Sequence, residues 1–287
     1  MTDQLTEFLF PDHGVRGAIA AIRSGLPEMF GWRNYAPLVR NLLGEAAIAM
    51  PLLASHSKHE GRMNLQFRGD GELKMLVAQV ARSLRVRAMA KADENVQGGY
   101  AELMGKGQFA LLLEPERGTQ AYQAVVPAQG ASLSAALEHY FQRSEQLPTR
   151  VKLASTGEAL AGILIQRLPE EVASADGWQH LNILFDTLGA DELAATEPAT
   201  ILHRLFHAEN LRVFEPRALT LACSCSHASI SGLLLSIGEQ ELAPVLAERG
   251  KVEVGCEFCG RNYAYTAMEL KELFEAQSAG PAGARPQ

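Results

Sequence analysis

The chain has 287 residues, of which 47% are hydrophobic, so it can bury a substantial core, and its length predicts one large domain with one or two smaller ones. Its 33 acidic and 26 basic residues give a formal net charge of -7 without a long basic run, which argues against a nucleic-acid-binding surface. The first residues lack the positively charged region of a signal peptide, and no stretch approaches about eighteen uninterrupted apolar residues. We therefore expect a globular cytoplasmic protein without a membrane segment.

The first 171 residues are predicted to form an α+β domain. Apolar residues recur at helical spacing over residues 35–53, where Pro37 fits the first turn, and over residues 132–145, where Ser132 is a suitable N-cap. Strand patterns occur at residues 15–19, 63–67, 84–90, 109–113, 122–126, 151–153 and 162–168, and the partner of 63–67 is expected to begin at Leu73. Turn sequences at Gly69-Asp70-Gly71 and Glu116-Arg117-Gly118 predict two hairpins. Hairpins pair neighbouring strands in opposite directions, so mainly antiparallel sheets are expected.

Residues 172–222 have a different composition, which is acidic and rich in alanine. Two short apolar stripes, at Leu181–Leu188 and Ile201–Phe206, indicate short amphipathic helices. Helices of this length are marginal alone and become stable only when an apolar face packs on a neighbour. The sequence therefore predicts a metastable helical linker.

Residues 223–275 are predicted to form a small C-terminal domain. Helices are expected at residues 231–237, 239–247 and 268–274, with a short strand at 252–254. A domain of this size with so few large apolar residues is usually stabilised by a metal ion or another cross-link. Residues 276–287, rich in Ala, Gly and Pro, are expected to be a disordered tail.

All four cysteines lie in this last part of the chain. Cys223 and Cys225 form a Cys-x-Cys pair, and Cys256 and Cys259 form a Cys-x-x-Cys pair followed by Gly260. Two tight pairs of sulfur ligands can converge on one tetrahedral ion, and zinc is the metal that this ligand set favours. Without a signal peptide, structural disulfides of a secreted protein are the less favoured interpretation.

The cysteine pairs have a second possible role, in redox sensing. Zinc-bound sulfur is thiolate, which is the form that oxidants attack, and each pair can also close on itself as a short-range disulfide. The ligands would then double as an oxidation sensor. Spacing alone leaves a purely structural zinc site as an equal alternative.

Other motifs for catalysis or ligand binding are weak. His56 with His59, and His203 with His207, lack the carboxylate of a zinc-protease motif, so no such site is expected. Surface or interface roles are expected for His203 and His207, which are four residues apart on a predicted helix. His227 lies two residues after Cys225 and is the alternative ligand, although four cysteines are the simpler set. Neither a nucleotide-binding Gly-x-x-x-x-Gly-Lys-Ser/Thr motif nor a Gly-x-Ser-x-Gly nucleophile motif is present, so we expect no nucleotide and no enzyme activity.

Taken together, the residues resemble the zinc-dependent, redox-regulated 33 kDa chaperonins of bacteria over nearly the whole chain. The resemblance rests on the two cysteine pairs at their separation, on Gly69-Asp70-Gly71, and on the segment from Tyr140 to Thr149, which reads Tyr-Phe-Gln-Arg-Ser-Glu-Gln-Leu-Pro-Thr. Asp3-Gln4-Leu5 and Val15-Arg16-Gly17 agree as well. The sequence departs from similar members after the first pair, where His227, Ala228 and Ser229 stand in place of charged residues.

The resemblance implies a stress-response holdase, which binds unfolding client proteins without ATP during heat and oxidative stress. It implies a reduced, inactive form that holds one Zn²⁺ per chain through Cys223, Cys225, Cys256 and Cys259. Oxidation would release the zinc, form the disulfides Cys223–Cys225 and Cys256–Cys259, unfold the linker and expose apolar surface. The active form is expected to be a homodimer.

The sequence leaves two alternatives to this interpretation. The first is a zinc-ribbon module with a purely structural zinc, which binds RNA or a ribosomal partner and for which Arg261, Tyr263 and Tyr265 supply a thin basic and aromatic surface. The second is a thiol oxidoreductase that uses Cys256 and Cys259, but the motif lacks a thioredoxin-like βαβ context.

Overall fold

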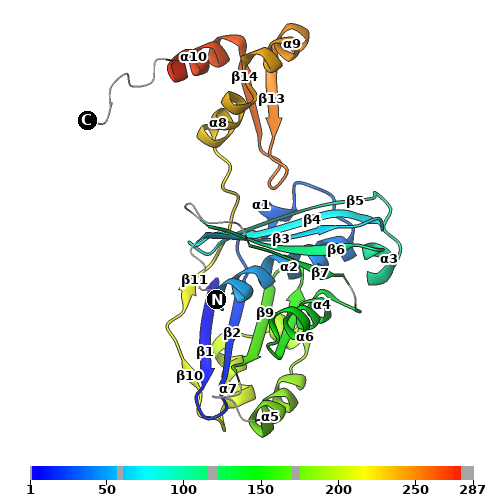
Figure 1. Cartoon of the computed structure of the whole chain (residues 1–287), viewed down its shortest axis with the longest axis vertical. Helices are drawn as coiled ribbons and strands as arrows, with labels where there is room; N and C mark the ends of the chain where they lie inside the picture. Colours follow the sequence, from blue (N-terminus) through cyan, green and yellow to red (C-terminus); the bar gives the residue numbers. More distant parts are fainter. Residues whose placement is uncertain (1, 57–60, 116–121, 129, 170–174, 279–287) are drawn as a thin grey trace, which may run out of the picture. The chain divides into compact units, whose positions relative to one another are not determined.

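The computed structural model describes residues 2–56, 61–115, 122–128, 130–169 and 175–278. The chain divides into two compact units, Met1–Ala222 and Cys223–Gln287 (Figure 1). Both contain helices and antiparallel strand pairs, so the predicted α+β class with mainly antiparallel pairing is confirmed.

The first unit contains two six-stranded sheets. The first sheet has the order β10-β1-β2-β9-β8, with β11 also pairing with β1, and all of its pairs are antiparallel. Its strands are β1 (Gln4–Phe10), β2 (Val15–Ile22), β8 (Thr149–Ser155), β9 (Leu160–Arg167), β10 (Arg212–Val213) and β11 (Arg217–Ala218). The two-residue strands β10 and β11 were not predicted, because two residues are too few to show an alternating pattern.

The second sheet has the order β12-β5-β4-β3-β6-β7, in which only the pair of β12 with β5 is parallel. Its strands are β3 (Gly61–Arg68), β4 (Leu73–Val80), β5 (Arg85–Ala92), β6 (Gln108–Pro115), β7 (Tyr122–Pro127) and β12 (Thr220–Leu221). The predicted pairing of β3 with β4 and of β6 with β7 is present, while the turn expected at residues 116–118 lies outside the described residues.

Helix α2 (Pro37–Ser55) is the core helix of this unit and contacts strands of both sheets. It is long and apolar enough to cross a membrane by composition alone, but 67% of its apolar window is buried inside the protein. Short helices α1 (Leu26–Phe30) and α3 (Tyr100–Met104) were not predicted. Helix α4 (Leu133–Tyr140) begins with the predicted Ser132 cap, whose hydroxyl accepts a hydrogen bond from the Ala135 N–H at 3.2 Å, and continues as the π-helix η1 (Phe141–Glu145).

Helices α5 (Ala175–Asp186), α6 (Ala190–Ala195) and α7 (Pro198–Phe206) pack on the first sheet. Their buried residues form one cluster with Phe8, Phe10 and Val15 of the β1–β2 hairpin and with Ile163 and Ile165 of β9. The predicted stripes therefore do pack on a neighbour.

The second unit comprises α8 (His227–Ile237), α9 (Glu239–Arg249), β13 (Lys251–Gly255), β14 (Asn262–Thr266) and α10 (Ala267–Ser278). Strand β14 was not predicted, and α8 begins four residues before the predicted start. Residues 276–278 belong to α10, which corrects the expected start of the disordered tail, and residues 279–287 lie outside the described residues.

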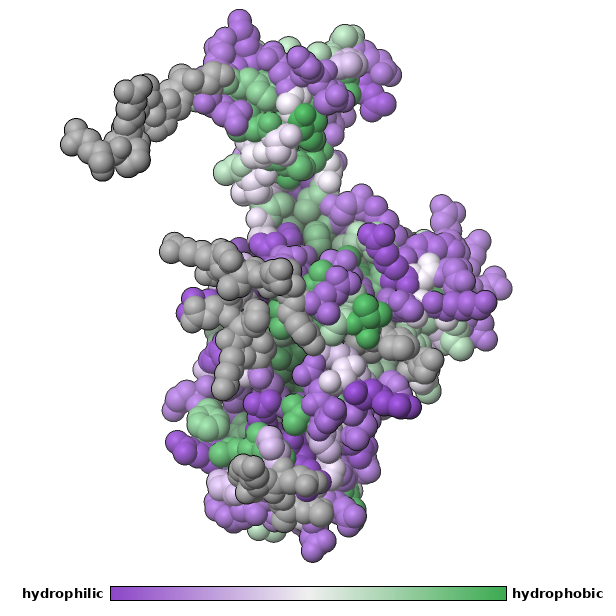
Figure 2. Space-filling model, viewed as in Figure 1, coloured by the Kyte–Doolittle hydropathy of each residue, from purple (hydrophilic) through white to green (hydrophobic). Residues whose placement is uncertain are grey.

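The buried core of the second unit is small: Ile230, Leu234, Leu242, Val252, Tyr263, Tyr265 and Leu270. Hydrophobic residues are also visible on the surface of this unit in Figure 2, and Leu233, Ile237 and Met268 are exposed large apolar side chains. A core of this size gives little stability by itself, so a cross-link through the cysteines would have a large effect.

Candidate metal centre

Two short segments of the second unit carry the four cysteines. Cys223 and Cys225 lie in the extended segment that leads into α8, whose N-cap is Ser226. The Ser226 hydroxyl accepts a hydrogen bond from the Ser229 N–H at 3.2 Å, which fixes the start of the helix directly after Cys225.

Cys256 and Cys259 lie in the turn between β13 and β14. The Cys256 N–H donates to the Arg261 carbonyl oxygen at 2.9 Å, and the Gly260 N–H donates to the Cys256 carbonyl oxygen at 2.8 Å. Gly260 has a φ of 69°, a left-handed conformation that glycine adopts without steric cost. These bonds turn both side chains toward the same point.

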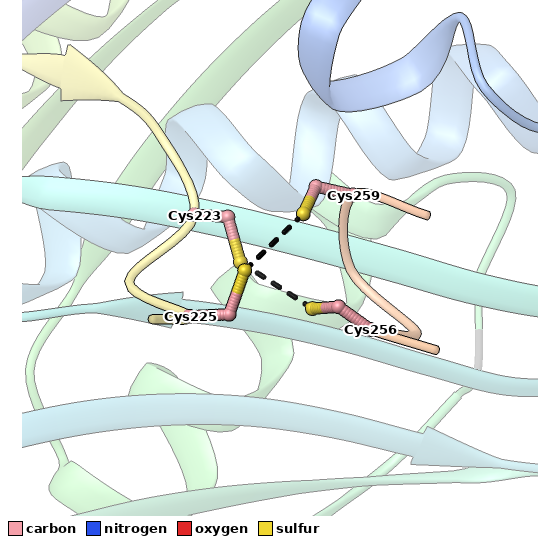
Figure 3. Close-up of side chains that lie close together, drawn as sticks. All are labelled: Cys223, Cys225, Cys256 and Cys259. Atoms are coloured by element: carbon pink, nitrogen blue, oxygen red, sulfur yellow. Dashed lines mark hydrogen bonds between the residues drawn. The ribbon is translucent and has the colours of Figure 1, made fainter. Parts of the chain in front are cut away.

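The four sulfur atoms meet, and all lie within 4.8 Å of one another (Figure 3). Sγ of Cys223 is 3.6 Å from Sγ of Cys256, and Sγ of Cys225 is 3.5 Å from Sγ of Cys259. Four sulfurs bound tetrahedrally to one ion at about 2.3 Å are about 3.8 Å apart, whereas disulfide-bonded sulfurs are about 2.05 Å apart. The cluster thus fits a single metal ion and consists of free cysteines.

The electrostatics of the cluster also favour a cation. Burial raises the pKa of Cys223 and raises that of Cys259 to about 12. Burial acts in the same direction on Cys225, but hydrogen bonds from Tyr263 and Cys259 outweigh it and lower its pKa to about 7. Without an ion, four ionised sulfurs this close together would repel one another, and a bound divalent cation removes that penalty.

No histidine of the described residues joins the group formed by the four cysteines. Among the described residues, only the four cysteines form a group of three or more potential ligands close enough to share one ion. The ring of His227 packs edge-on against the ring of Tyr263, and the ring centroids are 4.9 Å apart. The backbone carbonyl oxygen of His227 accepts a hydrogen bond from the Tyr265 hydroxyl. His203 on α7 and His207 at its C-cap are both exposed, as expected for surface residues, and His59 lies outside the described residues.

Sequence reasoning missed the role of Tyr263. Its hydroxyl donates to Sγ of Cys225 at 3.1 Å, although it was considered only as part of a nucleic-acid surface. The alternation of Tyr263 and Tyr265 was the available signal, because residues two apart in a strand share one face. That face is buried, with exposed fractions of 2% and 6% for the two residues.

The chain is similar to known proteins over nearly its whole length. Residues 3–266 match a family model described as "Hsp33 protein". The chain is 39% identical over 290 residues to the 33 kDa chaperonin of Neisseria gonorrhoeae strain NCCP11945, covering 99% of this chain and 96% of that protein. It is 33% identical over 285 residues to the 33 kDa chaperonin of Methylobacillus flagellatus, covering 98% and 97%.

The fold is similar to the crystal structure of the 33 kDa chaperonin of Thermotoga maritima, with a TM-score of 0.81 and 22% identity over 96% of this chain and 99% of that one. This likeness shows the fold. The family-model match and the identity to curated relatives show more: this chain belongs to the Hsp33 family.

Proposed function

We propose that this protein is a redox-regulated, ATP-independent holdase. In its reduced form, Cys223, Cys225, Cys256 and Cys259 hold one Zn²⁺ and the protein is inactive. The observation that supports this most strongly is the convergence of four free cysteine sulfurs within 4.8 Å in a unit with a small apolar core. A four-sulfur tetrahedral set is typical of structural zinc.

The metal would stabilise the second unit. Structural zinc contributes about 10–16 kcal/mol in small metal domains, whereas typical proteins have net stabilities of about 5–15 kcal/mol. With only seven buried hydrophobic residues in its described cluster, the second unit is not expected to survive loss of the ion. The cysteines thereby couple the folding of this unit to their own redox state.

Oxidation supplies the signal. One peroxide molecule takes two electrons from a pair of cysteine thiolates and two protons from solvent, giving one disulfide bond and two water molecules, so two peroxides convert all four cysteines. Disulfide sulfurs are no longer thiolates and bind the metal poorly, so the zinc is released. We expect the disulfides Cys223–Cys225 and Cys256–Cys259.

The apolar surface for clients would come from the first unit. Helices α5, α6 and α7 contain 12, 6 and 9 residues, and isolated helices shorter than about 12–15 residues are marginal in water. Their detachment would uncover both their own stripes and the face of the first sheet that contains Phe8, Phe10 and Ile165. A contiguous apolar patch of this kind binds unfolding proteins.

The expected partners are unfolding client proteins and, in the active form, a second copy of the chain. We assign no nucleotide, nucleic acid or membrane as a partner, no enzyme activity, and a cytoplasmic location. The zinc-ribbon alternative is less well supported, because Tyr263 and Tyr265, which would supply its aromatic surface, are buried in the core of the second unit.

The experiment compares reduced and peroxide-treated protein. Oxidation should release one zinc per chain, increase hydrogen exchange in residues 175–278 but not in α2, and turn on suppression of aggregation of a thermally unfolding enzyme. If residues 175–278 stay protected after the zinc has left, or if oxidised protein suppresses aggregation no better than reduced protein, the proposed switch is wrong and the zinc is structural.

A further inference from the structure

A second candidate site lies in the first unit. A cavity of about 390 Å³ is lined by residues of both sheets, the end of α2 and the segment that follows α4. Its apolar walls include Leu111 and Leu113 of β6 and Phe141 of η1. Cavities that bind small ligands have volumes of about 300–1,000 Å³, with mostly apolar walls and a few oriented polar groups.

Two polar residues that line the cavity, Arg16 and Gln166, are bonded to each other. These residues are opposite each other on β2 and β9. Nε and Nη2 of Arg16 both donate to Oε1 of Gln166, at 3.0 and 2.5 Å. A guanidinium has five N–H donors, and among the described residues no other hydrogen bond of Arg16 is formed, so three donors remain for a ligand or water.

Hydrogen bonds to Thr149 and Leu147 fix the orientation of the Gln166 amide. Its Nε2 donates to Oγ1 of Thr149 at 2.9 Å, and the Thr149 hydroxyl donates to the Leu147 carbonyl oxygen at 2.9 Å. Because Thr149 accepts from the amide nitrogen, the amide oxygen must point to Arg16. Leu147 and Thr149 belong to the Gln-Leu-Pro-Thr segment that the sequence singled out, so this segment holds the guanidinium in place for recognition.

Arg16 is the only strong cation among the described residues that line the cavity. Burial lowers the pKa of His56 to about 3, and the charge of Arg16 acts in the same direction, so this imidazole is neutral at pH 7. Glu145 also lines the cavity, but its carboxylate accepts a 2.6 Å hydrogen bond from Tyr140. The negative charge of Glu7 also acts on Arg16, but Glu7 does not line the cavity. Its carboxylate accepts a 3.2 Å hydrogen bond from Arg217.

From this arrangement we propose that the cavity binds a small amphipathic monoanion, namely a carboxylate with a short aliphatic tail. The carboxylate would accept hydrogen bonds from the free N–H donors of Arg16, and the tail would lie against Leu111, Leu113 and Phe141. A partly buried cation is stabilised by a paired anion, and its single positive charge is neutralised by one carboxylate. This proposal does not depend on the redox switch.

The test is isothermal titration calorimetry on the full-length reduced protein with octanoate, and with octan-1-ol as the uncharged analogue. Octanoate should bind one site per chain and octan-1-ol at least about tenfold more weakly, since a hydrogen bond to a charged group contributes about 1.5–3 kcal/mol. Arg16→Met should weaken octanoate binding by about tenfold or more and leave octan-1-ol binding unchanged.

Arg87→Met is the matched control, because Arg87 donates to Gln79 across neighbouring strands of the second sheet in the same way but does not line the cavity. Its octanoate affinity should equal that of the wild type. Leu113→Trp, which fills the cavity and leaves Arg16 in place, should abolish binding. Circular dichroism confirms that each variant is folded.

Three results would overturn the proposal: no octanoate binding, equal binding of octanoate and octan-1-ol, or equal loss of binding in Arg16→Met and Arg87→Met. Binding of an uncharged apolar peptide that displaces octanoate equally well from the wild type and from Arg16→Met would also overturn it, because the cavity would then bind client segments. If Arg16→Met does not fold, the comparison of octanoate with octan-1-ol still tests whether the site prefers an anion. Leu113→Trp then tests whether the ligand binds in this cavity.

Discussion

The hydroxyl group of Tyr263 donates a hydrogen bond to Sγ of Cys225 over 3.1 Å. Tyr263 lies on β14, four residues after the second cysteine pair, whereas Cys225 belongs to the first pair. The bond therefore connects the two halves of the cysteine cluster independently of an ion, and it places a donor on one of the four sulfurs.

We predict that Tyr263→Phe weakens metal binding. Residues that hydrogen-bond to metal ligands typically contribute about 10–100-fold in metal affinity. The measurement is competition for zinc with a chromophoric chelator. Tyr265→Phe is the control, because the Tyr265 hydroxyl contacts Ser231 and the His227 carbonyl oxygen and none of the four sulfurs. Equal zinc affinities of the two variants would show that the bond to Cys225 does not support the metal site.

A second contact ties the helical segment to the first sheet. Oε2 of Glu209 is 2.8 Å from Nε2 of His13 in the β1–β2 turn, and Oε1 is 2.8 Å from Nε2 of His180 on α5. The hydrogen bonds with His13 and then His180 lower the pKa of Glu209 below 4.5. A carboxylate with a lowered pKa stabilises the folded state above its ordinary pKa, and this contribution disappears as the pH falls through the lowered value.

We therefore predict that Glu209→Gln lowers the thermal midpoint of the first unit at pH 7 but not at a pH below the lowered pKa. A loss of about 1 kcal/mol corresponds to a shift of about 2–4 °C in a protein of this size. Differential scanning calorimetry over a pH series measures it. Glu192→Gln, which removes a carboxylate bound to Arg204 in an exposed pair, should cause a smaller shift. A shift for Glu209→Gln that does not change with pH would contradict the prediction.

We predict that Phe206→Ala activates the reduced, zinc-bound protein. Phe206 is 1% exposed and packs edge-on against Phe10, with ring centroids 4.9 Å apart. Its loss should cost about 3–5 kcal/mol, enough to loosen α7 from the sheet. Aggregation of a client protein without oxidant is the assay, and Ile183→Ala on the exposed face of α5 is the control. The prediction is wrong if both variants are equally inactive although hydrogen exchange in α7 is faster in Phe206→Ala. That result would show that loosening α7 is not sufficient for client binding.

Peptide mapping after peroxide treatment tests the disulfide pattern. Sulfur contacts of 3.6 and 3.5 Å join Cys223 to Cys256 and Cys225 to Cys259, so the folded cluster also brings together sulfurs of different pairs. Chain entropy favours bonds within each pair once the unit unfolds, because closing a short loop costs less than closing a long one. We expect mainly Cys223–Cys225 and Cys256–Cys259. A predominance of bonds between the pairs would show that oxidation precedes unfolding.

The sequence predicted those features that depend on local patterns. The spacing of Leu42, Leu43, Ala46 and Met50 placed α2 within two residues at both ends, and alternation of apolar residues located most long strands. The two cysteine pairs were expected to converge because their spacing brings sulfur ligands together, and the four sulfurs do lie within 4.8 Å. Their role as zinc ligands stays a prediction.

Contacts between distant residues could not be predicted in this way. His13 and Glu209 are 196 residues apart and Arg16 and Gln166 are 150 apart, so both contacts depend on how the sheets and helices assemble. The two-residue strands β10, β11 and β12 have no periodicity to detect and owe their conformation to the strands they join.

Those short strands lie along open borders of both sheets. Strands β10 and β11 occupy the outer side of β1, and β12 occupies the outer side of β5. An uncovered edge strand has unpaired N–H and C=O groups, with which another extended chain can form hydrogen bonds. The ten residues from Arg212 to Leu221 thus shield two such borders, and their release would turn β1 and β5 into templates for self-association.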